Sequence, residues 1–395
     1  MFKVLLWLAI AIRLAVVLVA WTQVVPSWSG GGDSGAYIAL AESLLSGAGY
    51  TYAGQPTAFR PPGYPLLLAG AMWVFGEFWP VAIRLLQFAL GIHTAFIVGE
   101  VAARFWDSEV RRPAIILALW HPGLIYITTL IGTESFGAWA IAFFLGLALR
   151  GRIVSGALLG IATLFRQAAP VLCLPLLLTL KPWKKWVLAA GLAALIVLPW
   201  AVRNWYSLGS FTHSTYTNIT LLAGILDPTG RTQPSKAPLM KHTLGWSIAD
   251  YETNNPQMQF PGELDMTRSA MEKYREILVA DPYLPVRVLP EKLGAFWLSL
   301  DMLGYSPLRA LAVLYWYSLF GLVLAGFFIP SLRHRYFALV WLVTITLAHV
   351  PFCMNTRLRI PFADVVVIAL AAGVAARFRW GRWLGSETLV PKRPS

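Results

Sequence analysis

The sequence predicts an all-α polytopic membrane protein. Of its 395 residues, 57% are hydrophobic and only 13% are charged, whereas a soluble domain has about 25% charged residues. The apolar residues form continuous runs and do not alternate with polar ones, which excludes a transmembrane β-barrel. The 18 tryptophans suit the headgroup zone of a bilayer, where amphipathic rings are favoured.

The hydrophobic runs predict about ten membrane crossings, because one crossing needs roughly 20 apolar residues. Several runs are short, so we expect tilted helices or a locally thinned bilayer. Residues 62–76 also resemble a crossing, but we expect an interfacial helix there, because a crossing would move the basic residues 104–112 to the outside. The expected crossings lie at 4–25, 81–103, 113–131, 135–149, 153–166, 168–180, 186–203, 307–329, 336–352 and 361–377.

These crossings divide the chain into three parts. Residues 1–203 are expected to form an N-terminal transmembrane module, with a first external loop at 26–80. Residues 204–305 form a small external region, and 306–395 contain the last transmembrane helices and a cytoplasmic tail. Prolines interrupt the external region, but residues 263–280 have the period of an amphipathic helix.

The net charge of +13 reflects topology and is no sign of a nucleic-acid partner. The basic residues fall in short loops or in the tail, and all of these can lie on one side of the membrane, which is the positive-inside pattern. Anionic membrane lipids are their natural partner. The residues concerned are Arg104, Arg111, Arg112, Arg150, Arg152, Lys181, Lys184, Lys185, Arg333, Arg335, Arg377, Arg379 and Arg382.

Common cofactor and nucleotide motifs are missing from the sequence. It contains no phosphate-binding loop, no dinucleotide fingerprint, no HExxH and no CxxC. Cys173 and Cys353 are far apart and lack metal-ligand spacing. The N-terminal apolar run is long for a signal peptide, so we expect an uncleaved anchor.

Two acidic residues fall in external loops and are candidate catalytic groups. Asp33 follows the first crossing and is flanked by glycines, and Glu134 lies in the turn before residues 135–149. Ionisable residues at membrane sites usually serve function, so we favour a general base for Asp33. Each could instead cap the helix that follows it, and for Glu134 the two interpretations are balanced.

Four arginines at external ends of crossings are candidate phosphate ligands: Arg60, Arg203, Arg357 and Arg359. They run against the positive-inside bias, and the planar guanidinium binds phosphate in a bidentate manner. The alternative is internal ion pairing with acids. We favour phosphate binding for Arg60 and Arg359, and less strongly for Arg203. Two tyrosines of the first loop, Tyr37 and Tyr64, are expected to line the substrate site.

The first loop, GDSGAYIALAESLLSGAGY followed by FRPPGYPLLLAGAMWVFG, resembles that of GT-C glycosyltransferases, in the branch of protein O-mannosyltransferases and aminoarabinose transferases. HPGLIYITTLIGTESFGAW, ATLFRQAAPVL, LPWAVRNWYSLGSF and RLRIPFADVVVIALAAGV agree in order. The chain departs from the family pattern at Ser34, where a second acid often follows the catalytic one, and at Leu358, where an aromatic residue often lies between two arginines.

The resemblance implies a GT-C-like bundle with interfacial helices beside the membrane. It implies a polyprenyl-phosphate-linked sugar as donor and an acceptor that is a lipid, a glycan or a protein. Asp33 and Glu134 correspond to the catalytic acids and Arg60 to a residue near the donor phosphate. We expect a bacterial inner membrane, with the site facing the periplasm or exterior.

The expected reaction is a single displacement that inverts the anomeric carbon, with Asp33 acting on the acceptor hydroxyl. No cofactor is certain. A divalent metal shared by Asp33 and Glu134 stays open, although the few carboxylates favour chemistry without metal. The alternatives are a lipid or solute transporter and a non-catalytic subunit of a membrane glycan-assembly complex.

Overall fold

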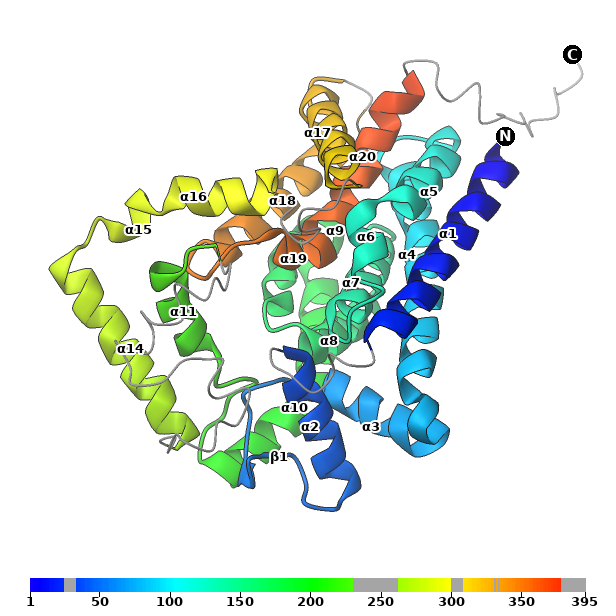
Figure 1. The fold of residues 1–395 in the computed structure, drawn as a ribbon. Coiled ribbons are helices and arrows are strands. Elements are labelled where there is room, and N and C mark those ends of the chain that lie inside the picture. Colours follow the sequence, from blue (N-terminus) through cyan, green and yellow to red (C-terminus); the bar gives the residue numbers. More distant parts are fainter. Residues whose placement is uncertain (25–32, 230–261, 300–307, 330–331, 333, 378–395) are drawn as a thin grey trace, which may run out of the picture.

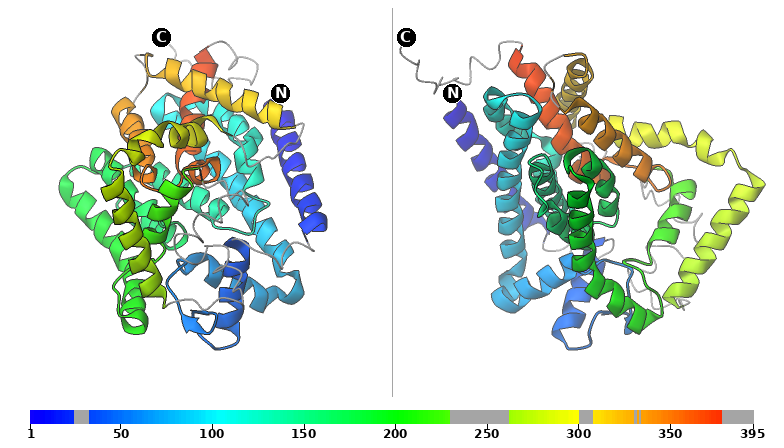
Figure 2. Two further views of the ribbon diagram at one scale, coloured as in Figure 1. Left: turned by 60° about the vertical axis from the view of Figure 1, so that its left-hand side comes forward. Right: turned by 180° about the vertical axis from the view of Figure 1, so that it is seen from behind.

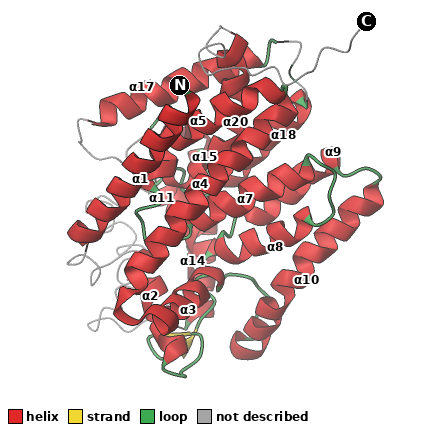
Figure 3. Ribbon diagram, turned by 90° about the vertical axis from the view of Figure 1, so that its right-hand side faces the viewer, coloured by secondary structure: helices red, strands yellow, loops and turns green. Residues whose placement is uncertain are grey.

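The computed structural model describes residues 1–24, 33–229, 262–299, 308–329, 332 and 334–377. Within these ranges the protein is helical apart from one short strand pair, β1 (Thr51–Tyr52) with β2 (Gln55–Pro56). Figure 3 shows this composition directly, with the strands confined to the loop near α2 and α3. The predicted all-α class is therefore confirmed.

Among the described residues, five helical segments are long and apolar enough to cross a membrane, and the chain is an integral membrane protein. Shorter apolar helices accompany them. The long segments are Phe2–Val19, Gly63–Phe105, Trp183–Leu208, Arg309–Gly326 and Thr356–Ala375, and the shorter ones are Glu134–Ala148, Ser155–Phe165, Ala169–Thr179, Thr217–Leu226 and Arg335–His349. The number of actual crossings stays a prediction.

The N-terminal half contains the first loop and most of the bundle. Its helices are α1 (Phe2–Val24), α2 (Asp33–Leu45), α3 (Gly63–Phe75), α4 (Trp79–Phe105), α5 (Arg111–Trp120), α6 (Pro122–Tyr126), α7 (Glu134–Ala148), α8 (Ser155–Phe165), α9 (Cys173–Thr179) and α10 (Trp183–Leu208), with the 3-10 turns η1 (Gly76–Phe78), η2 (Ser108–Val110) and η3 (Ala169–Leu172).

The C-terminal half closes the bundle and carries the outlying helices. These are α11 (Thr217–Leu226), α14 (Glu263–Ala280), α15 (Leu284–Arg287), α16 (Leu289–Leu293), α17 (Leu308–Gly326), α18 (Arg335–His349), α19 (Thr356–Arg359) and α20 (Val365–Ala375). Two short π-helical segments, η4 (Gly294–Leu298) and η6 (Ile360–Asp364), complete the described elements.

The expected crossing at 113–131 is divided into α5 and α6. His121 separates them with an extended backbone, and Pro122 follows it. The ring of a proline disfavours the helical conformation of the residue before it, so the helix ends there. The His121 ring then caps α6, because its Nδ1 accepts a hydrogen bond from the Leu124 N–H.

Helix α20 lies at the centre of the bundle because its own residues are small or apolar on every side. All eleven of its residues are buried, and it packs against α4, α5 and α17. Gly373 permits the closest approach, since a Cβ at that position would lie 2.1 Å from the Trp106 ring. The Trp106 indole N–H donates to the Ala369 carbonyl of the same helix.

The two ends of the bundle differ in what they carry. The start of α1 and the end of α20 lie at one end, and α2 with the strand pair lies at the other (Figure 1). Glu100 pairs with Arg111 and Arg150 at the end near the termini. Arg333, Arg379 and Arg382 lie outside the described residues.

The outlying helices frame the end that carries the first loop. Helix α3 lies across the end of α4 (Figure 2, right), and its position at the membrane interface stays a prediction. The predicted helix at 263–280 is confirmed as α14. Helices α14, α15 and α16 form an angular arm beside α11 (Figure 1), and residues 230–261 and 300–307 of the expected external region lie outside the described residues.

Candidate active site

Asp33 is the first residue of α2, where the helix dipole favours a carboxylate. The next residue fixes the position of this helix start, because the Ser34 hydroxyl donates to the Ile131 carbonyl at 2.8 Å. That bond ties α2 to the segment before α7. The side chain of Asp33 keeps 28% of its surface exposed.

Arg60 approaches Asp33 from the segment between the strand pair and α3. Its Nη2 lies 2.5 Å from Asp33 Oδ1. The guanidinium is nearly buried against aromatic rings, with Tyr216 at 4.7 Å, Phe59 at 5.1 Å and Tyr37 at 5.6 Å from its Cζ atom. Such rings stabilise a cation, so Arg60 is held in one place.

Glu134 is the first residue of α7 and is only 1% exposed. Its Oε1 accepts from Arg357 Nε at 2.7 Å and from Arg166 Nη1 at 3.2 Å. Its Oε2 is buried without a hydrogen-bond partner. Gly132 leaves room for this oxygen, because a Cβ at that position would lie 2.3 Å from it.

Arg357, in α19, connects the two carboxylates. Its Nε contacts Glu134, and its Nη2 lies 2.7 Å from Asp33 Oδ2. The result is a continuous ionic cluster, in the order Arg60, Asp33, Arg357, Glu134, Arg166. Five segments that are distant in sequence meet there, and one positive charge is left over. We call these five residues the buried cluster.

The surroundings set the charge state of Asp33. Burial by itself raises the pKa of a carboxyl, but the guanidiniums of Arg60 and Arg357 outweigh that effect and hold the pKa of Asp33 well below its usual range. Asp33 is therefore ionised throughout the neutral pH range.

Arg359 points away from Arg357 although only one residue separates them. Successive residues of a helix are about 100° apart, so positions i and i+2 lie on nearly opposite faces. Arg359 is fully buried, pairs with Asp364 at 2.8 Å, donates to the Phe296 carbonyl and lies 3.5 Å from the Trp316 ring centre. Arg359, which was expected to bind phosphate, therefore lies in the protein core and outside the buried cluster.

The other predicted site residues form the support of the cluster. Arg203 donates to the carbonyls of Thr57 and Tyr50, both at 2.6 Å, and so holds the first loop against α10. Tyr64 is buried and donates to Gln87, and its ring meets Tyr37 edge to face at 5.2 Å. Tyr37 in turn lies beside Arg60.

Two polar residues at this end lie away from the ionic contacts. Lys292 is buried and donates to the Val350 carbonyl at 2.6 Å, and burial lowers the pKa of its amine to about 8. Glu42 is exposed on α2.

Sequence reasoning missed one connection at this end. Glu263, at the start of α14, accepts from the Ala58 N–H at 2.8 Å and from the hydroxyls of Thr57 and Thr215. The amphipathic arm is thus attached to the loop that carries Arg60. The period of 263–280 predicted the helix, but no sequence signal indicated where its first residue docks.

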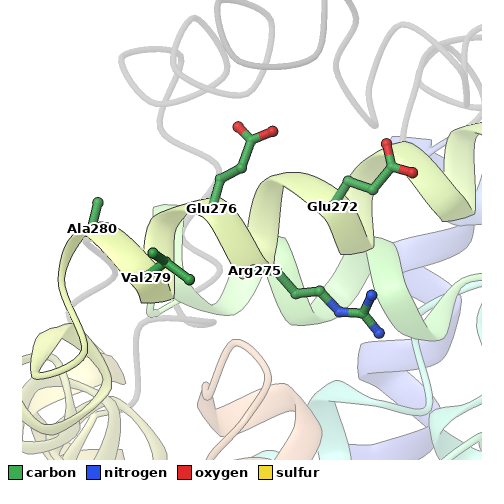
Figure 4. A pocket seen from close by; sticks show the side chains of 5 residues that line it. All are labelled: Glu272, Arg275, Glu276, Val279 and Ala280. Atoms are coloured by element: carbon green, nitrogen blue, oxygen red, sulfur yellow. The ribbon is translucent and has the colours of Figure 1, made fainter.

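The described residues do not fit a metal shared by Asp33 and Glu134. Within those ranges no three His, Cys, Asp or Glu side chains gather closely enough to hold an ion. The space between the two carboxylates is taken by the Arg357 guanidinium. A shallow pocket on α14, lined by Glu272, Arg275, Glu276, Val279 and Ala280, comes from a single helix (Figure 4) and contains none of the cluster residues.

No family model and no curated protein sequence matches this chain. Among solved structures, it is similar to the Archaeoglobus fulgidus oligosaccharyltransferase tethered with an acceptor peptide, with a TM-score of 0.56 and 18% identity over 96% of this chain. The chain has the fold of a GT-C glycosyltransferase. At this identity the likeness concerns the fold alone.

Two further structures complete the comparison. The archaeal oligosaccharyltransferase AglB from the same organism, in complex with an inhibitory peptide and a dolichol-phosphate, matches with a TM-score of 0.55 and 17% identity over 100% of this chain. This chain spans about half of those archaeal chains, 50% and 52%. ArnT from Cupriavidus metallidurans bound to undecaprenyl phosphate matches 94% of this chain and 77% of its own, at 14% identity and a TM-score of 0.37.

Proposed function

We propose that this GT-C protein transfers a sugar from a polyprenyl-phosphate-linked donor to an acceptor on the non-cytoplasmic side of the membrane. The observation that carries the proposal is the buried cluster, in which two carboxylates and three guanidiniums from five segments meet. The archaeal neighbours of the same fold were solved with an acceptor peptide and with dolichol-phosphate, which are the two kinds of ligand that such a reaction brings together.

Arg357 is the arginine best placed to receive the donor phosphate. Its side chain is 36% exposed, whereas Arg60 and Arg166 are nearly buried. Its contacts with Asp33 and Glu134 use Nε and one Nη atom, and a guanidinium has five N–H donors. The outer edge of Arg357 can therefore bind phosphate while the inner edge keeps both carboxylates. Arg357 thus replaces Arg359 as the expected phosphate ligand.

Asp33 is the group that acts on the acceptor. Its carboxylate is the more exposed of the two acids and lies next to Arg357, so an acceptor hydroxyl bound there would face the anomeric carbon of the donor. In the ligand-free protein the lowered pKa makes Asp33 a weak base. A phosphate on Arg357 offsets part of the positive charge and raises the basicity of Asp33, so donor binding prepares the acceptor step.

The leaving group is a lipid phosphate, which needs no strong general acid. As the bond to the sugar breaks, negative charge develops on that phosphate, and a fixed guanidinium stabilises it. Glu134 and Arg166 hold Arg357 from behind. One displacement of this kind inverts the anomeric centre. The loop attached to α14 through Glu263 is where we expect the acceptor to be selected.

The proposal is tested by offering purified protein a panel of polyprenyl-phosphate sugars and measuring the polyprenyl phosphate that is released. Asp33→Asn should lower the release by about 100-fold or more, the range that loss of an acid or base produces. Arg268→Ala, which removes an exposed ion pair on α14, serves as the control and should behave as wild type.

Either of two results would contradict the proposal. Release by Asp33→Asn at the wild-type rate would remove Asp33 from the reaction. If folded wild-type protein consumes no donor of the panel with any lipid, glycan or peptide acceptor, the function itself fails, and a transporter or an assembly subunit is left.

A further inference from the structure

A guanidinium lies at the point where the two carboxylates of the buried cluster converge. Arg357 reaches Glu134 Oε1 through Nε and Asp33 Oδ2 through Nη2, both at 2.7 Å. The two contacts use one edge of a rigid plane, so they fix the separation of the two acids as well as their orientation. An ordinary surface pair would leave both side chains free to rotate.

We propose that Arg357 is the permanent cation of this site, holding Asp33 and Glu134 in the way a divalent ion would and making the reaction independent of metal. The claim that a metal-independent reaction takes place depends on the proposed function. The position of the cation between the two acids depends only on the contacts of Arg357. Arg357 is thus a positioning residue for both acids in addition to its contact with the donor phosphate.

Geometry separates the two kinds of cation. A divalent ion needs its oxygen ligands at about 2.0–2.6 Å from one centre. Here each carboxylate contacts a different nitrogen of the guanidinium, so the two oxygens are spread across the width of the group. An ion could bind both acids only after Arg357 had left the space between them.

The charge of the cluster also disfavours a metal ion at this position. Arg60 and Arg166 already neutralise the outer sides of the two acids. With Arg357 in place the buried cluster has one positive charge in excess. A divalent ion added to the intact cluster would place two more positive charges beside three guanidiniums in a poorly solvated site, which is unfavourable.

The inference predicts that removal of Arg357 creates a metal site. In Arg357→Ala, Asp33 and Glu134 would face each other without their shared counter-ion, and Glu134 Oε2, which has no partner in the described structure, becomes a third oxygen ligand. We expect this variant to bind one Mn²⁺ about tenfold more tightly than wild type, because affinity follows the number of charged ligands. Electron paramagnetic resonance distinguishes free from bound Mn²⁺ and needs no enzymatic activity.

Matched variants identify the site. Adding Asp33→Asn to Arg357→Ala should abolish the gained binding. Arg111→Ala at the other end of the bundle also removes an arginine from a carboxylate, but Arg111 pairs with Glu100 there and does not join two acids among the described contacts, so this variant should gain no Mn²⁺. Donor consumption by wild type should persist after treatment with a chelator.

Wild type and variants of the two acids can overturn the inference, even if Arg357→Ala does not fold. A Mn²⁺ bound by wild type and lost in both Asp33→Asn and Glu134→Gln would place an ion where we place the guanidinium. A folded Arg357→Ala that gains no Mn²⁺ would also contradict it. The proposed function fails separately, through absence of donor consumption, which leaves the Mn²⁺ result unaffected.

Discussion

Two ionic clusters at opposite ends of this bundle contain the same kinds of residue and differ in their surroundings. Near the termini, Glu100 bridges Arg111 and Arg150, and all three side chains are well exposed, Arg111 at 46%. In the buried cluster, Glu134 bridges Arg166 and Arg357 and is 1% exposed. Counted over its own members, each cluster has one positive charge in excess.

The comparison teaches that ion pairs of the same residue types depend on one another more strongly where they are shielded from water. At the exposed end, water and salt screen the pairs, and such pairs contribute about 0–1 kcal/mol. In the buried cluster Glu134, Arg60 and Arg166 are nearly buried and depend on their partners, because a buried ion without one is strongly destabilising. We propose that the surplus guanidinium there attracts an anion, whereas the surplus at the exposed end is screened by water and salt.

The largest difference is expected when the bridging acid is removed. Glu134→Ala removes the carboxylate that pairs with Arg166 and should lower the free energy of unfolding by about 3–5 kcal/mol. Glu100→Ala should lower it by less than about 1 kcal/mol. Chemical denaturation in detergent measures both, and equal effects would remove the distinction between the two clusters.

A smaller effect is expected from crowding the buried acid. In Gly132→Ala the new Cβ would lie 2.3 Å from Glu134 Oε2, so the carboxylate must shift, at about 1–3 kcal/mol. Gly70→Ala, within α3, meets nothing within 4 Å and should gain up to about 1 kcal/mol from helix propensity. Thermal unfolding compares the pair, and a Gly132→Ala variant as stable as wild type would show that Glu134 is not confined.

The smallest predicted effect concerns pH. The pKa of Asp33 is lowered in the folded protein, so its contribution to stability is complete above the ordinary pKa of about 3.9 and is lost as pH falls toward the folded value. The stability difference between wild type and Asp33→Asn should therefore stay constant from about pH 8 to 5 and shrink only below about pH 4. A difference that already shrinks between pH 7 and pH 5 would mean that the pKa is raised.

Much of this arrangement could be predicted from the sequence. Apolar runs predicted the long apolar helices, and the period of residues 263–280 predicted α14 with its bounds. Asp33, Arg60 and Glu134 were selected as external polar residues in a membrane protein, and the structure brings them into one cluster. These features could be predicted because each depends on the residues of one short segment of the sequence.

The roles of Arg357 and Arg359 could not be separated in that way. In an extended segment the two side chains would share a face, but in the helical turn of α19 they point in opposite directions. Only the conformation of these four residues decides which arginine reaches Asp33. The pairing of Arg166 with Glu134 and the docking of Glu263 on Thr57 were also not predictable, because they join segments through packing of the whole bundle.

The central claim is that the buried cluster, and not the basic end, binds the lipid phosphate. Arg357 and Arg111 form a matched pair, because both contact carboxylates and keep a comparable share of their surface exposed, 36% and 46%. Titration of purified protein with a polyprenyl phosphate tests the claim without any acceptor. Arg357→Ala should weaken the affinity by about tenfold or more, since a charged hydrogen bond contributes about 1.5–3 kcal/mol, and Arg111→Ala should leave it unchanged. Equal affinities in the two variants would contradict the account.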